Sequence, residues 1–287
     1  MRIGLHALGI GAGADPAVIT AVARAAEECG FAILWAGEHV VMVDQPDSVY
    51  PYADDGRIAV PSNTDWLDPL VLFGFVAAVT SRLRLATGVL LLPEHNPVTA
   101  AKSVASLDRL SDGRFTLGVG IGWSVAEFDA LGISFIGRGR RTEEYVEAMR
   151  VLWREDVSSY VGSHVYFEGV RCYPKPVHRT VPVVFGGNSD RALRCVAACG
   201  DGWYGFNVAP NQVADRLALL RSVWQEEGRD PRGLDVSIAL RQGEPDDLPA
   251  LEALRVDEVV VVGAPPDDPD EAADWVDSLA ARWAVGR

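Results

Sequence analysis

The chain has 287 residues, of which 48% are hydrophobic and 23% are charged, and its formal net charge at pH 7 is −14. This length and composition allow a large buried core and exclude a disordered chain. The negative charge argues against non-specific binding to nucleic acid or to an anionic membrane surface, so we expect neither as a partner.

The sequence lacks the patterns of a signal peptide, a membrane-spanning segment, a disulfide framework and a metal site. Its N-terminus runs directly into a strand-like segment, without the charged, long apolar and small-residue regions of a signal peptide. The longest apolar run, Leu70–Val79, is far shorter than the roughly 20 residues that span a bilayer. The four cysteines show neither a disulfide framework nor a CxxC zinc spacing, and no two histidines have metal-ligand spacing. We expect a reduced cytoplasmic protein without a metal site.

Strands and helices alternate along the chain. Apolar runs predict strands at Arg2–Leu8, Phe31–Ala36, Leu83–Leu92, Phe115–Val119, Val181–Phe185, Gly202–Phe206, Leu234–Leu240 and Asp257–Val262. Helical spacing, Asp-Pro or Asn-Pro starts and glycine stops predict helices at 16–29, from 69, at 97–110, 124–131, 142–153, 190–199, 210–227, 248–254 and 270–283.

This order predicts the fold class. Eight strands, most of them followed by a helix, in a chain near the ~250 residues typical of the fold, predict an α/β protein, a (β/α)8 TIM barrel. Ser159–Val170 reads as a small hairpin outside the main sheet, before the fifth strand. An open doubly wound sheet is the alternative. We expect one domain over residues 1–287.

Glycines strip the side chains from one end of the predicted sheet. Leu83–Gly122 reads as strand, helix and strand, and it ends in Gly118, Gly120 and Gly122. A bare strand end is a place where a flat ligand can lie against backbone. In a barrel, functional residues sit at these C-terminal strand ends.

Titratable side chains follow the first strands. His39 and Glu38 come directly after the second strand, which favours a proton-transfer role over a loop histidine that only bonds backbone. His6 and His95 could also face the mouth. Val40–Trp66 is long enough to be either a lid or a disordered loop.

Two segments could meet an anion. Gly186–Ser189 lies between a strand and a helix, where backbone N–H groups and the helix dipole favour phosphate; an ordinary turn with an Asn cap is the alternative. Arg138, Arg140 and Arg141 precede the predicted helix at 142–153 and could bind a phosphate or carboxylate, or form a solvated charge run.

Several of these segments together resemble a known family. The matching pieces are GFAILWAGEH (Gly30–His39), TGVLLLPEHNPVTAAKSVASLDRLSDGRFTLGVGIGW (Thr87–Trp123), EFDALG (Glu127–Gly132), RGRRTEEYVEAMRVLW (Arg138–Trp153) and VVFGGNSDRALRCVAACGDGW (Val183–Trp203). In this order they resemble the luciferase-like oxidoreductases, most closely the branch that uses the deazaflavin coenzyme F420, which is common in actinobacteria.

The resemblance implies a luciferase-like barrel that holds a flavin-type ring over the strand ends. It implies a cis peptide bond at Gly88-Val89 and a proton-transfer role for His39 with Glu38 beside it. Position and resemblance together give these cofactor-binding residues: His6, Thr87, Gly88, Val89, Gly120, Ile121, Gly122, Gly186, Gly187 and Asn188. Trp123 stands where sugar-phosphate dehydrogenases of this branch carry a glutamate, which predicts an apolar substrate pocket containing Trp123 and Trp66.

The resemblance also implies a reaction. We expect an F420-dependent oxidoreductase that transfers hydride between F420 and a small organic substrate, as a homodimer because relatives are commonly dimeric. An FMN-dependent two-component monooxygenase is the first alternative, and a non-catalytic flavin- or F420-binding protein is the second. Gly88-Val89, without extra phosphate-binding tyrosines or arginines, favours F420 over FMN.

Overall fold

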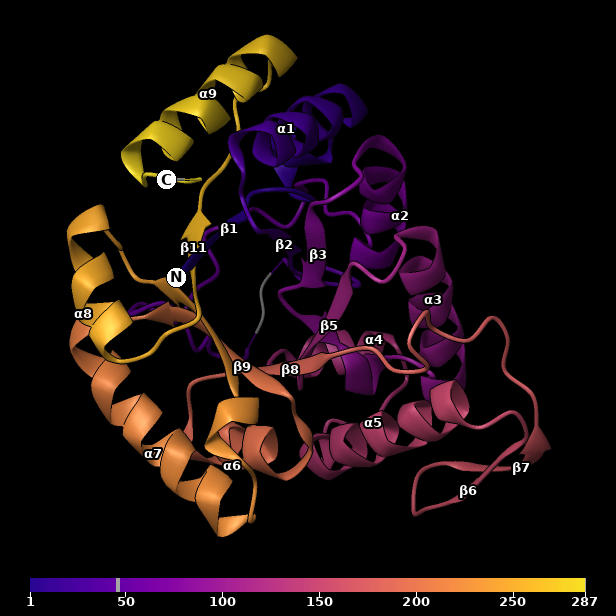
Figure 1. Ribbon diagram of the computed structural model, residues 1–287. Helices are drawn as coiled ribbons and strands as arrows, with labels where there is room; N and C mark the ends of the chain where they lie inside the picture. The colour runs from indigo at the N-terminus through magenta and orange to yellow at the C-terminus, as the bar shows by residue number, and fades with distance from the viewer. Residues whose placement is uncertain (45–46, 287) are drawn as a thin grey trace.

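A closed parallel barrel forms the centre of the computed structural model, which describes residues 1–44 and 47–286 (Figure 1). Within these residues the barrel strands are β1 (Arg2–His6), β2 (Ile33–Ala36), β3 (Arg84–Thr87), β5 (Phe115–Gly120), β8 (Val183–Gly186), β9 (Gly202–Val208), β10 (Asp235–Leu240) and β11 (Glu258–Val262). They pair in the order β3-β2-β1-β11-β10-β9-β8-β5, and β3 pairs with β5 to close the ring. The predicted TIM barrel is therefore confirmed, and the open sheet is excluded.

The predicted strand Leu83–Leu92 is divided in two. β3 ends at Thr87, a short β4 (Leu90–Leu91) continues against β5, and the Gly88-Val89 peptide between them is cis, as the resemblance implies. The interruption places Val89 outside the ladder, where its side chain is free to enter the mouth of the barrel.

Helices surround the barrel in Figure 1. In the described residues they are α1 (Pro16–Cys29), α2 (Pro69–Val79), α3 (Pro97–Leu110), α4 (Val125–Ala130), α5 (Arg138–Arg154), α6 (Asp190–Cys199), α7 (Val213–Glu226), α8 (Leu248–Ala253) and α9 (Pro269–Arg282). Single turns of 3₁₀ helix are η1 (Gly11–Ala14), η2 (Leu92–Glu94), η3 (Pro210–Gln212), η4 (Pro231–Gly233) and η5 (Pro245–Asp247). Asp15, Asp68 and Asn96 cap α1, α2 and α3 through side-chain oxygens, with Pro following each.

Two helix predictions need correction. The helix expected at 142–153 begins at Arg138, because Gly137 in the left-handed conformation starts it (φ +76°). The three arginines of this segment therefore lie inside the first turn of α5 rather than before the helix. The helix expected at 210–227 is a 3₁₀ turn followed by α7.

The hairpin expected at Ser159–Val170 is present as β6 (Ser158–Val161) and β7 (Tyr166–Val170), outside the barrel at the edge of Figure 1. Two groups of buried side chains fill the rest of the molecule, one between strands and helices and one inside the barrel. Inside, Trp35 stacks on Tyr204 with ring centroids 4.2 Å apart. This plug closes the barrel below the C-terminal strand ends and leaves the mouth above it open.

Across residues 1–44 and 47–286, no helix combines the length and hydrophobicity that crossing a membrane requires. The expected cytoplasmic location stays a prediction.

Candidate functional site

Two adjoining cavities occupy the mouth. One of about 490 Å³ runs from the end of β5 to the start of α6 and is lined by Gly120–Trp123, Arg138 and Gly186–Ser189, among others. The second, about 410 Å³, extends under the segment after β2 and is lined by His6, His39 and Trp66, among others. The residues that line both cavities include Val89, Leu91, Trp123, Gly186 and Gly187.

Val89 separates these spaces by covering two glycines. A Cβ atom added at Gly120 would clash with Val89 Cγ2, and one added at Gly186 would lie 2.9 Å from Val89 Cγ1. Neither position has room for a side chain larger than hydrogen. The expected bare strand ends are present, with a valine seated between them as an apolar ridge.

Thr87 lies below this ridge. It is fully buried, and its hydroxyl donates to the Gly118 carbonyl (2.7 Å) and accepts from the Gly118 N–H (2.8 Å). Thr87, expected to bind the cofactor, thus holds β3 against β5 through its side chain. Gly88 lines the second cavity, and Ile121 and Gly122 line the first.

His39 is held from behind by a carboxylate that the sequence analysis did not single out. His39 Nδ1 lies 2.8 Å from Oε2 of Glu127, whose Oε1 accepts from the N–H groups of Val40 and Val41. The imidazole packs edge-on against Trp66 (4.9 Å between centroids). Since Nδ1 is used by Glu127, Nε2 is the atom left to act on a ligand.

Glu38 does not pair with His39. Its carboxylate accepts from the N–H of Leu91 (2.6 Å) and contacts His95 Nε2 (2.9 Å). Burial opposes the charged form of His95, but its hydrogen bond to Glu38 prevails and raises the pKa of His95. Glu38 therefore anchors β4 and its following turn, and Glu127 in the EFDALG segment takes the place beside His39.

Glu94 is a second carboxyl that sequence reasoning missed. It is 6% exposed, and neither of its oxygens has a hydrogen-bond partner among the described residues. Burial, reinforced by the charges of Glu127 and Glu38, raises the pKa of Glu94 to about 9. At neutral pH it is an uncharged carboxylic acid directly behind Gly122, since a Cβ there would lie 2.9 Å from Glu94 Oε1.

His6 lines the second cavity as a neutral imidazole. Its Nδ1 is 2.8 Å from the Tyr204 hydroxyl, and burial lowers the pKa of His6 to about 4. It can orient a ligand through a hydrogen bond, but it does not carry a charge near pH 7.

The predicted phosphate loop adjoins two arginines. Ser189 caps α6, Gly187 has a φ of +100°, and the Asn188 amide donates to the Phe206 carbonyl while its Oδ1 is buried without a partner. Arg138 and Arg191 line the same cavity. Burial, with the nearby cations Arg191 and Arg141, lowers the pKa of Arg138. Of the three arginines considered for an anion, Arg138 lines this cavity, because α5 starts early enough to include it.

The segment after β2 covers the mouth with aromatic side chains. Tyr50 packs on Trp123 (5.2 Å between centroids) and Tyr52 on Phe206 (5.6 Å). Arg241 pairs with Asp54 at 2.9 Å and so ties the segment to the end of β10. Residues 45–46 of the expected lid Val40–Trp66 lie outside the described residues; the remainder is positioned as a cover.

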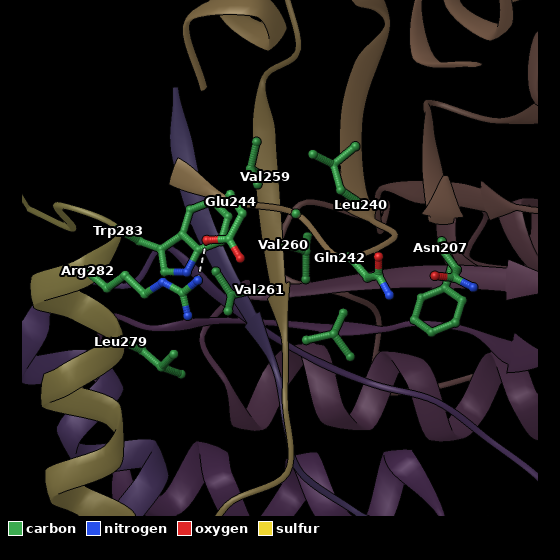
Figure 2. A pocket seen from close by; sticks show the side chains of 13 residues that line it. Asn207, Leu240, Gln242, Glu244, Val259, Val260, Val261, Leu279, Arg282 and Trp283 are labelled. Atoms are coloured by element: carbon green, nitrogen blue, oxygen red, sulfur yellow. Dashed lines mark hydrogen bonds and ion pairs between the residues drawn. The ribbon is translucent and has the colours of Figure 1, made fainter. Parts of the chain in front are cut away.

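A third cavity, about 290 Å³, lies beside the mouth between β10, β11 and α9 (Figure 2). Valines of β11 form one wall, and Leu279 and Trp283 the other. Glu244 and Arg282 form an ion pair at its edge, so the charges of these two groups cancel. In the described residues no three His, Cys, Asp or Glu side chains gather as a metal site would need.

Comparisons with known proteins agree with this architecture. A family model for luciferase-like monooxygenases matches residues 3–242. An uncharacterized protein of Mycobacterium tuberculosis is 38% identical over 268 residues, 92% of this chain and 93% of that protein. An FMNH₂-dependent dimethylsulfone monooxygenase of Pseudomonas putida is 35% identical over 133 residues, 45% of this chain and 36% of that enzyme.

Among solved structures, an F420-dependent secondary alcohol dehydrogenase in complex with an F420–acetone adduct has a TM-score of 0.77 at 17% identity, covering 100% of this chain and 99% of that chain. At that identity the likeness concerns the fold. The family model, which spans most of the chain, carries the assignment. The chain belongs to the luciferase-like monooxygenase family.

Proposed function

We propose that this chain is an F420-dependent oxidoreductase that acts on a small organic substrate. The observation that carries the proposal is His39: Glu127 fixes its Nδ1 side, and its ring lies in a mouth whose floor is glycine and Val89. A proton-transfer group beside a flat, side-chain-free surface fits a planar redox cofactor with a substrate next to it.

The residues fit a phosphate-bearing deazaflavin. The N–H groups at Gly186–Ser189, with Arg138 and Arg191, would hold a phosphate at the start of α6. Val89, Gly120 and Gly122 would support the ring. When bound, F420 supplies the hydride chemistry at C5 of its ring.

The protein's part is positioning and proton transfer. Nε2 of His39 would give a proton to the substrate oxygen or take one from it, according to the direction of hydride transfer. Trp66, Trp123 and Tyr50 form an aromatic wall that favours an apolar substrate. The segment tied down by Arg241 and Asp54 would exclude water.

Equilibrium titration with F420 and with FMN, followed by fluorescence, tests the proposal. We expect F420 to bind at micromolar concentration. Arg191→Met should weaken F420 binding by about 10-fold or more, the value of a charge-assisted hydrogen bond. Arg140→Met is the matched control, because Arg140 is exposed on α5. Absence of F420 binding would refute the assignment.

An FMN-dependent two-component monooxygenase is the second candidate. The relative from Pseudomonas putida is named as FMNH₂-dependent, and the two arginines beside the phosphate loop would serve FMN equally well. Tighter binding of FMN than F420, with oxygen uptake in the presence of reduced FMN, would favour it. If His39→Ala left any detected activity unchanged, a non-catalytic cofactor-binding role would gain support.

A further inference from the structure

One charged side chain lines the second cavity of the mouth without a partner. Apart from tyrosines, the titratable groups on this lining are His6, Glu38, His39 and Arg57. Hydrogen bonds to other side chains or to backbone occupy the first three. Arg57, from the covering segment, is the fourth, and it brings a positive charge to a cavity whose other walls are mainly apolar and aromatic.

The acids that precede Arg57 are engaged elsewhere. Asp55 accepts from the backbone N–H of Arg57 (3.0 Å), and Asp54 pairs with Arg241 (2.9 Å). No described residue accepts a hydrogen bond from the Arg57 guanidinium. Acidic side chains outnumber basic ones by 40 to 26 in this chain, so the missing partner does not reflect a shortage of carboxylates. The guanidinium is therefore free to bind an anion that enters the cavity.

The turn that precedes Arg57 is attached to the barrel. The Tyr50 N–H donates to the Gly56 carbonyl (2.8 Å), and Gly56 has the left-handed conformation that glycine favours (φ +69°). The Tyr52 carbonyl accepts from the Asn207 side chain near the end of β9, which adds a second attachment to the ion pair at the end of β10. Arg57 thus follows a turn whose position relative to the mouth is set.

The residues around Arg57 place its charge in the same cavity as the imidazole of His39. Ile58, the next residue, lines a small space together with His39 and Trp123. Trp66 and Trp123 pack edge-on with this imidazole, with centroid distances of 4.9 and 5.8 Å. A ligand in the cavity would meet aromatic rings along its body, the imidazole at one point and the guanidinium at another.

We propose that Arg57 binds an anionic group of the substrate, so that the substrate class is an organic oxyanion with an apolar body. A guanidinium offers paired N–H donors that match the oxygens of a carboxylate, sulfonate or phosphate. The apolar body lies against Trp66 and Trp123, and the reacting oxygen faces Nε2 of His39. The inference rests on the proposed function for the role of His39. Arg57 determines specificity and takes no part in hydride or proton transfer.

The anion position at Arg57 differs from the phosphate loop. Arg138 and Arg191 line the first cavity and not the second, whereas Arg57 lines the second and not the first. The phosphate of a cofactor and the anionic group of a substrate would therefore be held by different arginines, at separate places in one mouth.

Fluorescence titration of the whole protein with two related dyes tests the proposal. Anilinonaphthalene sulfonate has an aromatic body and one anionic group, and phenylnaphthylamine has the same rings without the sulfonate. We expect Arg57→Met to raise the Kd of the sulfonate by about fivefold or more, between the values of an exposed ion pair and of a charge-assisted hydrogen bond. The Kd of the neutral dye should stay the same, and Arg57→Lys should keep most of the sulfonate affinity.

Two other arginine variants are the controls. Arg140→Met removes an equal charge from an exposed position on α5 that lines neither cavity, and Arg191→Met removes one from the first cavity. The proposal is overturned if Arg57→Met leaves the sulfonate affinity unchanged or weakens both dyes equally. It is also overturned if either control variant weakens sulfonate binding as much as Arg57→Met does.

The result does not depend on the cofactor, because both titrations are made without F420. If F420 fails to bind while the sulfonate depends on Arg57, the proposed function is refuted and the anion position remains. If F420 binds and the sulfonate does not depend on Arg57, the oxidoreductase remains and the anionic substrate class is refuted.

Discussion

Glu94→Gln should stabilise the protein, and more so as the pH rises. The pKa of Glu94 is 4.5 in an ordinary setting and about 9 in the fold. Between these values the unfolded chain is ionised at this residue and the folded chain is not, so the folded state binds more protons. The contribution of the protonated Glu94 to the free energy of unfolding is therefore fully present below pH 4.5 and is lost as the pH rises toward 9.

The magnitude follows from the same shift. Each pH unit inside the window lowers the free energy of unfolding by about 1.4 kcal/mol, so at pH 7 wild type has lost about 3 kcal/mol at this site. Glutamine has the same shape and cannot ionise. Its advantage over wild type should therefore be near zero at pH 4.5, about 3 kcal/mol at pH 7, and greater at pH 8.

Urea denaturation of both proteins at pH 6, 7 and 8 measures this difference. Comparing variant with wild type cancels the other titrating groups, including His6 and Glu258, which have shifted pKa values of their own. A stability difference that stays constant over these three pH values would refute the assignment of a protonated Glu94.

Two further predictions concern the mouth and its cover. Gly120→Ala puts a methyl group against Val89 and should cost about 1–3 kcal/mol of unfolding free energy, as overpacking does; Gly74→Ala, with open space around it, should cost nothing by urea denaturation. Arg241→Ala releases Asp54 and should speed tryptic cleavage after Arg57 by up to about fivefold, the value of an exposed ion pair. Equal cleavage rates in wild type and variant would show that this ion pair does not hold the cover.

Local signals in the sequence predict the barrel well. Asp-Pro and Asn-Pro pairs start α1, α2 and α3 as expected, because a cap acts within one helical turn. The start of α5 was missed since three arginines disfavour a helix N-terminus by charge. Gly137 and the bonds of Arg138 and Arg141 to nearby carbonyls outweigh that cost.

The sequence predicted which residues lie at the mouth of the barrel better than it predicted which side chains contact each other there. The strand-end rule placed His39 and Gly186 at the mouth without knowledge of their partners. The pairing of His39 with Glu127 joins residues 88 positions apart, on elements that only the closed barrel brings together. Glu94 lies in a short run that looks like an exposed turn, and its burial depends on η2 packing against α5.

The two hydrogen bonds between the Thr87 side chain and the Gly118 backbone affect how β3 and β5 are joined in the barrel. Regular pairing between β3 and β5 stops at Ala86, and β4 resumes it only at Leu90. Across that gap the Thr87 hydroxyl replaces the backbone of a neighbouring strand. It donates one hydrogen bond to the Gly118 carbonyl and accepts one from the Gly118 N–H. The interruption of strand pairing around Val89 therefore leaves the Gly118 backbone groups hydrogen-bonded. Serine would keep both hydrogen bonds, whereas valine, which matches threonine in shape, would leave the Gly118 N–H and carbonyl unpaired in a buried interior.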